Sequence, residues 1–202
     1  SVTFIGAVSP AGGNLKEPVT ESTKKAARCF YALSQNRADS KRYPAIDTLD
    51  SYSKYLEYPE FIDYSKEKLD ENWVGLVNEA RNVLVRGKET EEQINILGDD
   101  SVPIDYHVTL WKSEFVDFVI LQQDAFDKID ATTSLERQEY MLKKVINVTR
   151  SEFKFEGFEE VAIYFKRLIN VFRQMNYTVF KSEEFHKVEE EANAVLEERI
   201  IK

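Results

Sequence analysis

Two aromatic residues lie at predicted element boundaries, where a ring can project into a groove instead of a core. Tyr43 precedes Pro44 in a turn-rich segment, and a ring held by a turn can form one wall of a base pocket. Stacking of a nucleobase on such a ring is worth roughly 1–3 kcal/mol. Phe126 is predicted to end the helix that begins near Ile104, just before Asp127. A ring at a helix end can instead belong to a core, and the sequence pattern alone favours the core interpretation for Phe126.

The other candidates for chemistry are weaker. The chain has neither a Gly-x-x-x-x-Gly-Lys-Ser/Thr phosphate loop nor a Gly-x-Gly-x-x-Gly motif, and the pair Gly12-Gly13 is typical of an ordinary turn. His107 lies near an aromatic stripe and is expected to be structural. His186 lies among glutamates, where a solvated charged face is favoured over a metal site. No spacing argues for a nucleophilic triad, so we predict no catalytic residue and no metal site in this chain.

Composition limits the classes of partner. The 202 residues carry 27 basic and 36 acidic side chains, a net charge of -9, which disfavours broad binding to negatively charged nucleic acid. Cys29 is the only cysteine, so an internal disulfide and a cysteine zinc cluster are excluded. No run approaches the roughly 18 apolar residues that span a bilayer, and we expect a cytoplasmic protein. Because the sequence begins at Ser1 with an apolar run, we expect a piece of a longer protein.

The first part of the chain has the pattern of α/β structure. The apolar residues from Thr3 to Val8 precede Ser9-Pro10, which predicts a buried strand that ends in a loop. Thr20 is expected to cap a helix. The apolar stretch from Ala26 to Leu33 fits either a strand or a helix, and a turn follows around Pro44. A sheet of two strands is marginal alone, so we expect its neighbours to be missing.

After Pro59 the apolar residues recur with helical spacing. The first stripe is predicted to end at Gly87, and Thr90 is predicted to open a capping box before a stop at Gly98. The stripes are Trp73 to Leu84, Ile104 to Phe118, Leu135 to Thr149, Phe158 to Phe172, and Phe185 to Val195. Thr133-Ser134 and Ser182 are predicted to cap the helices of the third and the last stripe. The stripe that begins at Phe158 is expected to face Trp111 or Phe115.

These patterns predict a mainly α fold. A C-terminal helical bundle, residues 58–202, is expected to follow a truncated α/β remnant, residues 1–57. The bundle is expected to fold on its own and to carry most of the stability.

Several longer segments carry a family resemblance, namely Gly6 to Gly13, Arg42 to Asp47, Leu97 to Pro103, Phe118 to Asp127 and Thr133 to Gln138. Together they make the chain resemble the C-terminal part of the catalytic A subunit of a V/A-type rotary ATPase. The resemblance is clear from about residue 2 to residue 150 and fades toward the C-terminus. It implies that residues 1–57 are the remnant of a nucleotide-binding domain.

The resemblance also implies roles for particular residues. It implies that Tyr43, Pro44, Gln123 and Phe126 form the adenine side of an ATP site, with the rings of Tyr43 and Phe126 clamping adenine across a cleft. It implies that the loop made of Ser9, Pro10, Ala11, Gly12 and Gly13 faces the central shaft. The bundle would be the lever that couples ATP hydrolysis or synthesis to shaft rotation and to proton or sodium transport.

The intact subunit that the resemblance implies binds ATP or ADP with magnesium. Its partners would be the non-catalytic B subunits and the central shaft subunit. It would be cytoplasmic and peripheral to the membrane, which it would reach only indirectly, through the ion-translocating sector. The phosphate-loop Lys and Thr, the water-activating Glu and the Walker B Asp of the family are expected before Ser1. This chain alone is therefore expected to be inactive and to carry no bound nucleotide.

Some residues depart from the A-subunit pattern and keep alternatives open. A subunits commonly have Phe where Tyr43 stands and Asn-Trp where Asp47-Thr48 stands. The residues from Tyr43 to Ser53 are more similar to the β subunit of F-type enzymes. The alternatives are therefore a fragment of an F-type β subunit, a fragment of a non-catalytic ring subunit, and a helical scaffold with no nucleotide role.

Overall fold

The computed structural model describes residues 2–201, and this range contains eight α-helices and one two-stranded sheet. The α-helices are α1 (Pro18–Ala26), α2 (Gln35–Asp39), α3 (Pro59–Lys68), α4 (Trp73–Leu97), α5 (Ile104–Val116), α6 (Leu135–Arg150), α7 (Phe158–Tyr177) and α8 (Glu183–Glu197). The strands are β1 (Cys29–Leu33) and β2 (Ile46–Ser53). Shorter helical turns are η1 (Ala11–Gly13), η2 (Lys54–Glu57), η3 (Asp99–Ser101) and η4 (Asp117–Leu121).

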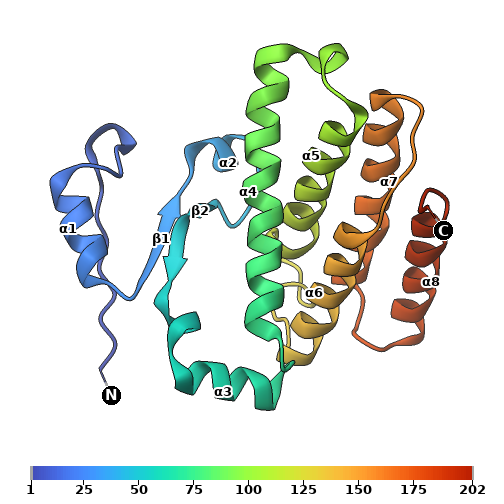
Figure 1. The fold of residues 1–202 in the computed structure, drawn as a ribbon. Helices are drawn as coiled ribbons and strands as arrows, with labels where there is room; N and C mark the ends of the chain where they lie inside the picture. Colours follow the sequence, from blue (N-terminus) through green and yellow to red (C-terminus); the bar gives the residue numbers. More distant parts are fainter. Residues whose placement is uncertain (1, 202) are drawn as a thin grey trace.

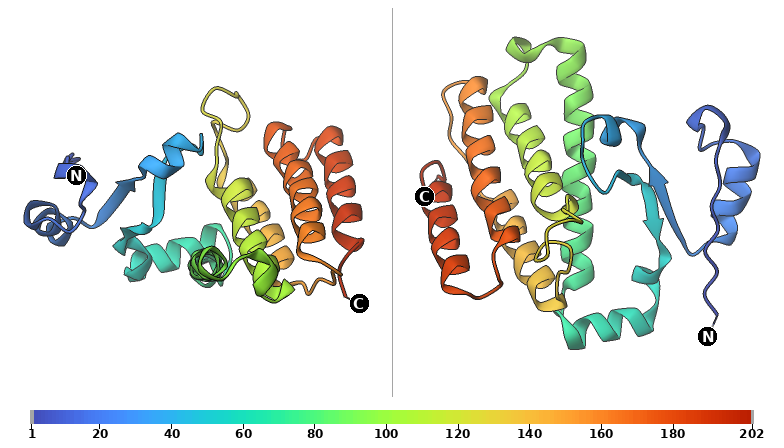
Figure 2. Two further views of the ribbon diagram at one scale, coloured as in Figure 1. Left: turned by 90° about the horizontal axis from the view of Figure 1, so that it is seen from above. Right: turned by 180° about the vertical axis from the view of Figure 1, so that it is seen from behind.

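The long helix α4 separates two unequal parts of the molecule (Figure 1). The sheet and α1 lie on one side of it, and α5 to α8 lie on the other, so the described ends of the chain are far apart. Seen from above, the helices of the bundle stand beside one another while the sheet extends outward (Figure 2). The prediction of a mainly α fold, with a helical bundle after an α/β remnant, is confirmed. The domain boundary between residues 57 and 58 stays a prediction, although α3 begins close to it at Pro59.

The stretch from Ala26 to Leu33, which fitted either strand or helix, contains β1. β1 pairs antiparallel with β2, with Cys29 opposite Ser53 and Leu33 opposite Ile46. A bulge between Phe30 and Ala32 interrupts the register, and the amide of Ala32 donates to the Ser51 hydroxyl at 3.0 Å. The segment between the two strands, residues 34–45, carries Tyr43, and α3 follows β2.

Two predictions for the N-terminal segment are wrong. Thr3 to Val8 is not a buried strand, because Phe4 and Ile5 are 94% and 92% exposed and no neighbouring backbone pairs with the segment in residues 2–201. Thr20 does not cap α1, which begins at Pro18 after Glu17. Proline is favoured at the first helical position, and the Thr20 hydroxyl donates instead to Glu17 at 2.9 Å.

The two breaks predicted inside α4 are also wrong. The helix runs without interruption through Gly87 and Thr90 and ends at Gly98, whose φ of 88° suits a glycine stop. Gly87 serves instead as a close-packing site, because a Cβ built there would lie 2.0 Å from the Cβ of Ser113 on α5. The glycine therefore lets α4 and α5 approach each other, and only the stop at Gly98 is confirmed.

The apolar core lies in the bundle. Every buried member of the main cluster of the described residues comes from Leu76 or later. The rings of Phe115 and Phe172 meet edge to face with their centres 4.9 Å apart, which confirms that the stripe beginning at Phe158 faces Phe115. The predicted caps at Ser134 and Ser182 are confirmed, since each hydroxyl accepts an amide of the first turn of its helix.

Candidate functional site

Tyr43 lies in the connection between β1 and β2, residues 34–45, which we call the Tyr43 turn. The amide of Ser34 donates to the carbonyl of Ala45 at 2.8 Å, which closes its base. The Ser34 side chain also accepts the amide of Arg37 and so caps the short helix α2. Tyr43, which precedes a cis peptide bond to Pro44, lies near the tip and is 55% exposed. The tyrosine ring therefore lies on the surface of the turn, and its role as a wall of a base pocket stays a prediction.

A cluster of charged side chains joins the Tyr43 turn to the bundle. Arg37 donates to one oxygen of Asp117 at 2.7 Å, and Arg42 donates to the other at 2.8 Å. Arg42 also reaches both oxygens of Glu114, at 2.7 and 3.0 Å, and its guanidinium lies over the ring of Phe118. Asp117 is only 4% exposed, whereas the side chains of Arg42 and Glu114 are 27% and 24% exposed, so the cluster joins the Tyr43 turn to the end of α5 at a partly buried position.

The charge state of Arg42 follows from these contacts. Burial alone would lower its pKa, but the hydrogen bonds and charges of Glu114 and Asp117 outweigh burial and raise it. Arg42 is therefore a fixed cation next to Tyr43. Arg37, Arg42, Glu114 and Asp117 were not singled out from the sequence. The available signal was the pair of arginines flanking the turn and two carboxylates three residues apart on one helix.

The segment after α5 meets the Tyr43 turn directly. The π-helical turn η4 ends at Leu121, and the amide of Gln123 donates to the carbonyl of Tyr43 at 2.9 Å. The side chain of Gln123 donates to the carbonyl of Asp130 at 2.6 Å. Gln123 thus links the turn to the loop that follows it, and the structure brings together two of the residues predicted for the adenine side.

Phe126 lies in that loop rather than at a helix end, so its predicted placement is wrong. Aspartate side chains bind the backbone amides here: Asp124 accepts from Phe126 at 2.9 Å, and Asp127 accepts from Asp130 at 2.8 Å. Such local bonds compete with helix continuation. The ring of Phe126 is 99% exposed, so the core interpretation is also wrong. The ring does not stack on Tyr43 in this structure, and the predicted clamp stays a prediction.

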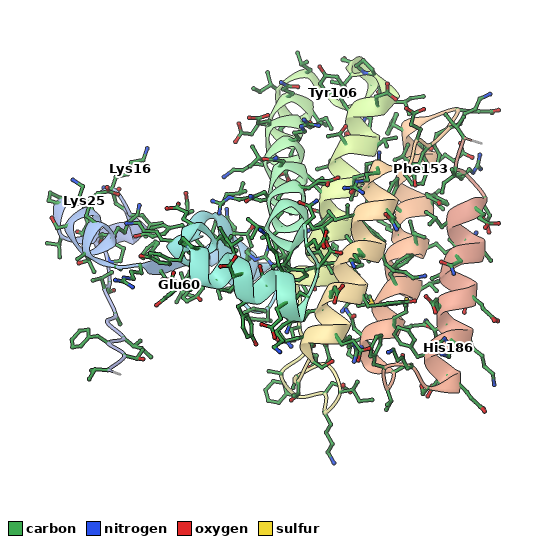
Figure 3. All side chains as sticks on the ribbon, turned by 60° about the horizontal axis from the view of Figure 1, so that its bottom comes forward. Lys16, Lys25, Glu60, Tyr106, Phe153 and His186 are labelled. Carbon is green, nitrogen blue, oxygen red and sulfur yellow. The ribbon has the colours of Figure 1, made fainter. Side chains whose placement is uncertain are left out.

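The loop from Ser9 to Gly13 is an exposed turn far from the Tyr43 turn. Gly12 and Gly13 have φ values of 62° and 72°, conformations that glycine adopts without strain. The amide of Gly13 donates to the carbonyl of Pro10 at 3.1 Å. The neighbouring side chains of Lys16 and Lys25 lie at the end of the molecule opposite His186 (Figure 3). Nothing in the described contacts ties this loop to the bundle.

The histidines do not form a site. His107 is buried, its Nε2 lies 3.1 Å from the carbonyl of Asp99, and its ring stacks on Phe158 with centres 5.0 Å apart. This is the structural role expected for it. His186 is exposed beside Glu189. Residues 2–201 hold no group of three or more side chains placed to bind a metal ion, and no helix within them has the length and apolarity needed to cross a membrane.

Comparison with known proteins shows that both parts of the chain are similar to ATP synthase sequences. Residues 1–53 match the nucleotide-binding domain of the ATP synthase alpha/beta family, and residues 62–156 match the C-terminal domain of V and A type ATP synthase. The V-type ATP synthase alpha chain of Borrelia duttonii (strain Ly) is 41% identical over 192 residues, which are 94% of this chain and 31% of that protein. The alpha chain of Protochlamydia amoebophila (strain UWE25) is 36% identical over 199 residues, 98% of this chain and 33% of that protein. The chain thus spans about a third of the length of these curated relatives.

Proposed function

We propose that this chain supplies the adenine side of a nucleotide site and the helical lever of an alpha chain. The chain belongs to the V/A-type ATP synthase family, and the proposal starts from that membership. The observation that carries this proposal is the 2.9 Å bond from the Gln123 amide to the Tyr43 carbonyl. It joins the two segments that each present an aromatic ring to solvent. A flat base needs two apolar walls, and exposed rings on joined segments are suited to provide them.

Coupling of the site to the bundle is the second part of the proposal. The turn at Tyr43 and the end of α5 share Arg42, Glu114 and Asp117, so a shift of the turn is transmitted to the bundle through short ionic contacts. The bundle has a continuous apolar core and can move as one body. Binding of adenine between Tyr43 and Phe126 would close the turn on the loop, and the cluster would carry that motion to α5.

The phosphates and magnesium would be held elsewhere in the alpha chain. The chain lacks a phosphate-loop motif, and phosphoryl transfer depends on positioning and charge around the phosphates. We therefore propose that this chain alone neither hydrolyses ATP nor binds it tightly, because adenine stacking does not offset the lost freedom of the ligand. A calorimetric dissociation constant tighter than roughly 10 μM would contradict this part.

Partners of the intact alpha chain complete the proposal. We place the non-catalytic B subunits and the central shaft among them, with the exposed loop Ser9 to Gly13 facing the shaft, and we place the assembly at the membrane through its ion-translocating sector. The comparisons name V-type alpha chains, which favours this role over an F-type β fragment, a non-catalytic fragment or a scaffold without nucleotide.

A chimeric enzyme tests the proposal. This chain replaces the matching segment of the Borrelia duttonii alpha chain, which assembles with that organism's other subunits, and ATP hydrolysis is measured against ATP concentration. Tyr43→Ala should raise KM for ATP about 5- to 150-fold, the loss of roughly 1–3 kcal/mol of stacking. Tyr43→Phe should leave KM nearly unchanged because it keeps the ring.

Tyr31→Ala is the matched control, since Tyr31 is an exposed tyrosine on β1 outside the proposed site. It should leave KM within about twofold of the parent chimera. If Tyr43→Ala also stays within that range while the parent chimera is active, Tyr43 does not bind adenine.

A further inference from the structure

A cavity of about 500 Å³ is lined mostly by residues of the bundle, and neither Tyr43 nor Phe126 is among its lining residues. Its walls come from α4, from η4 and from α6, and Thr48 of β2 lines its outer side. Trp73, Val77 and Met141 make part of the walls apolar. Small-molecule sites commonly have volumes of about 300–1,000 Å³, apolar walls and a few polar groups. The cavity therefore has the size and lining of a binding site.

Arg137 is a buried cation on the lining of this cavity. Its side chain lines the cavity and the residue is only 4% exposed, yet no carboxylate within residues 2–201 lies at ion-pair distance from it. One guanidinium nitrogen donates to the carbonyl of Met175 at 2.6 Å. Burial lowers the pKa of Arg137, and the more distant charges of Asp130 and Asp127 act in the opposite direction. A buried cation with donors to spare and no close anion lacks its usual partner.

A second donor without a partner lies on the same cavity. The side-chain nitrogen of Gln122 is buried and has no hydrogen-bond partner among the described residues. Buried donors are nearly always paired, so this nitrogen is a second donor that a ligand oxygen in the cavity would satisfy. The charged residues on the cavity are Arg81, Arg137 and Asp130, two cations against one anion. One oxygen of Asp130 already accepts the amide of Asp124 at 2.6 Å, so the lining favours an anionic ligand group.

We propose that this cavity binds a small organic carboxylate with an apolar body. The carboxylate would accept hydrogen bonds from Arg137 and Gln122, because a planar guanidinium matches the two oxygens of a carboxylate. The apolar body would lie against Trp73 and the neighbouring side chains of α4. Gln123 lines this cavity and also belongs to the proposed adenine side, but Arg137, Gln122 and Trp73, which carry this proposal, were not assigned to that side.

Fluorescence of Trp73 tests this proposal in the whole chain. The only other tryptophan is Trp111, so a Trp111→Phe background makes Trp73 the sole reporter. The probe is 3-phenylpropanoate, and its neutral match in shape is 3-phenylpropanamide. The acid should change the emission saturably and bind at least about tenfold more tightly than the amide, because hydrogen bonds to charged groups are about twice as strong. Arg137→Gln should abolish that preference.

Two further variants keep the test decisive. Arg150→Gln removes an arginine from the surface pair with Glu79 and should keep the preference for the acid. If circular dichroism shows that Arg137→Gln does not fold, Val77→Phe replaces it, since the larger ring fills the cavity and should abolish binding of the acid. The proposal is overturned if 3-phenylpropanoate gives no saturable change up to about 10 mM, or if acid and amide bind equally. It is also overturned if a folded Arg137→Gln keeps the preference, or if Val77→Phe binds the acid as the parent does.

Discussion

The charge cluster at Asp117 should stabilise the attachment of the Tyr43 turn to the bundle, and its removal should have a measurable energy. Asp117→Asn keeps the shape of the side chain but leaves Arg37 and Arg42 facing a neutral group at the present distances of 2.7 and 2.8 Å. Arg42→Met keeps an apolar stem beside Phe118 and removes the charge. The two changes therefore separate the loss of the shared anion from the loss of one cation.

The expected magnitudes follow from burial. Removing one partner of a buried ion pair typically destabilises by about 3–5 kcal/mol. Asp117 is nearly buried, but the side chains of Arg37 and Arg42 are 16% and 27% exposed, so water relieves part of the loss. We expect Asp117→Asn to lower the free energy of unfolding by about 2–4 kcal/mol. Arg42→Met should lower it by about 1–2 kcal/mol, because Asp117 keeps Arg37.

Urea unfolding of the single and double variants measures these terms. The double variant should be more stable than additivity predicts by about 1–2 kcal/mol, the coupling between two groups in direct contact. Hydrogen exchange of the Gln123 amide, which donates to Tyr43, should speed up in Arg42→Met because the turn is held less firmly. Lys68→Met, which breaks an exposed pair with Glu67, is the control and should change stability by less than about 0.5 kcal/mol. An Asp117→Asn protein within about 0.5 kcal/mol of the parent, or strict additivity, would refute the reasoning.

Three other measurements address the bundle. Gly87→Ala should destabilise by about 1–3 kcal/mol in urea despite the better helix propensity of alanine, since the new Cβ meets Ser113; a more stable variant would show that α4 and α5 are not so close. The hydrogen bond from Arg150 lowers the pKa of Glu79 below 4.5. The stability from that pair is therefore present above pH 4.5 and is lost as the pH falls through the lowered pKa. Glu79→Gln should flatten that loss of stability in urea titrations from pH 7 to pH 3, and an unchanged pH profile would contradict the pairing. Removal of residues 1–53 should leave a cooperative thermal transition by circular dichroism, because the core begins at Leu76, and a noncooperative one would mean that the bundle depends on the sheet.

The helical bundle could be predicted well because its signals are local. The stripe from Phe158 to Phe172 repeats with helical spacing, and the caps at Ser134 and Ser182 depend only on a hydroxyl and the amides of the next turn. The stop at Gly98 is local in the same way, since it needs a positive φ. Each of these elements forms where its own residues favour it.

The errors arose where contacts distant in sequence decide the structure. Gly87 reads as a stop, but its small size is required by Ser113 on another helix, which no local pattern shows. Thr3 to Val8 reads as a strand, but no neighbouring backbone pairs with it in residues 2–201. Phe126 was misplaced because Asp124, Asp127 and Asp130 fold the loop through side-chain bonds to amides.

The candidate site was predictable only in part. The turn at Tyr43 and the segment at Gln123 were singled out by residue type and by family resemblance, and the structure joins their backbones. The charge cluster of Arg37, Arg42, Glu114 and Asp117 could not be predicted. Charged residues in a sequence do not indicate which distant residues they will pair with. The burial of Arg137 beside a cavity likewise depends on the packing of α6 against α7.

A crystal structure of the chimeric alpha chain with magnesium and ADP tests the central claim most directly. The quantity is the separation between the ring centres of Tyr43 and Phe126 and what lies between them. The account predicts adenine between the two rings and a separation of roughly 7–10 Å, which corresponds to two aromatic stacking distances. Adenine bound away from either ring, or the two rings on opposite sides of the molecule, would contradict it.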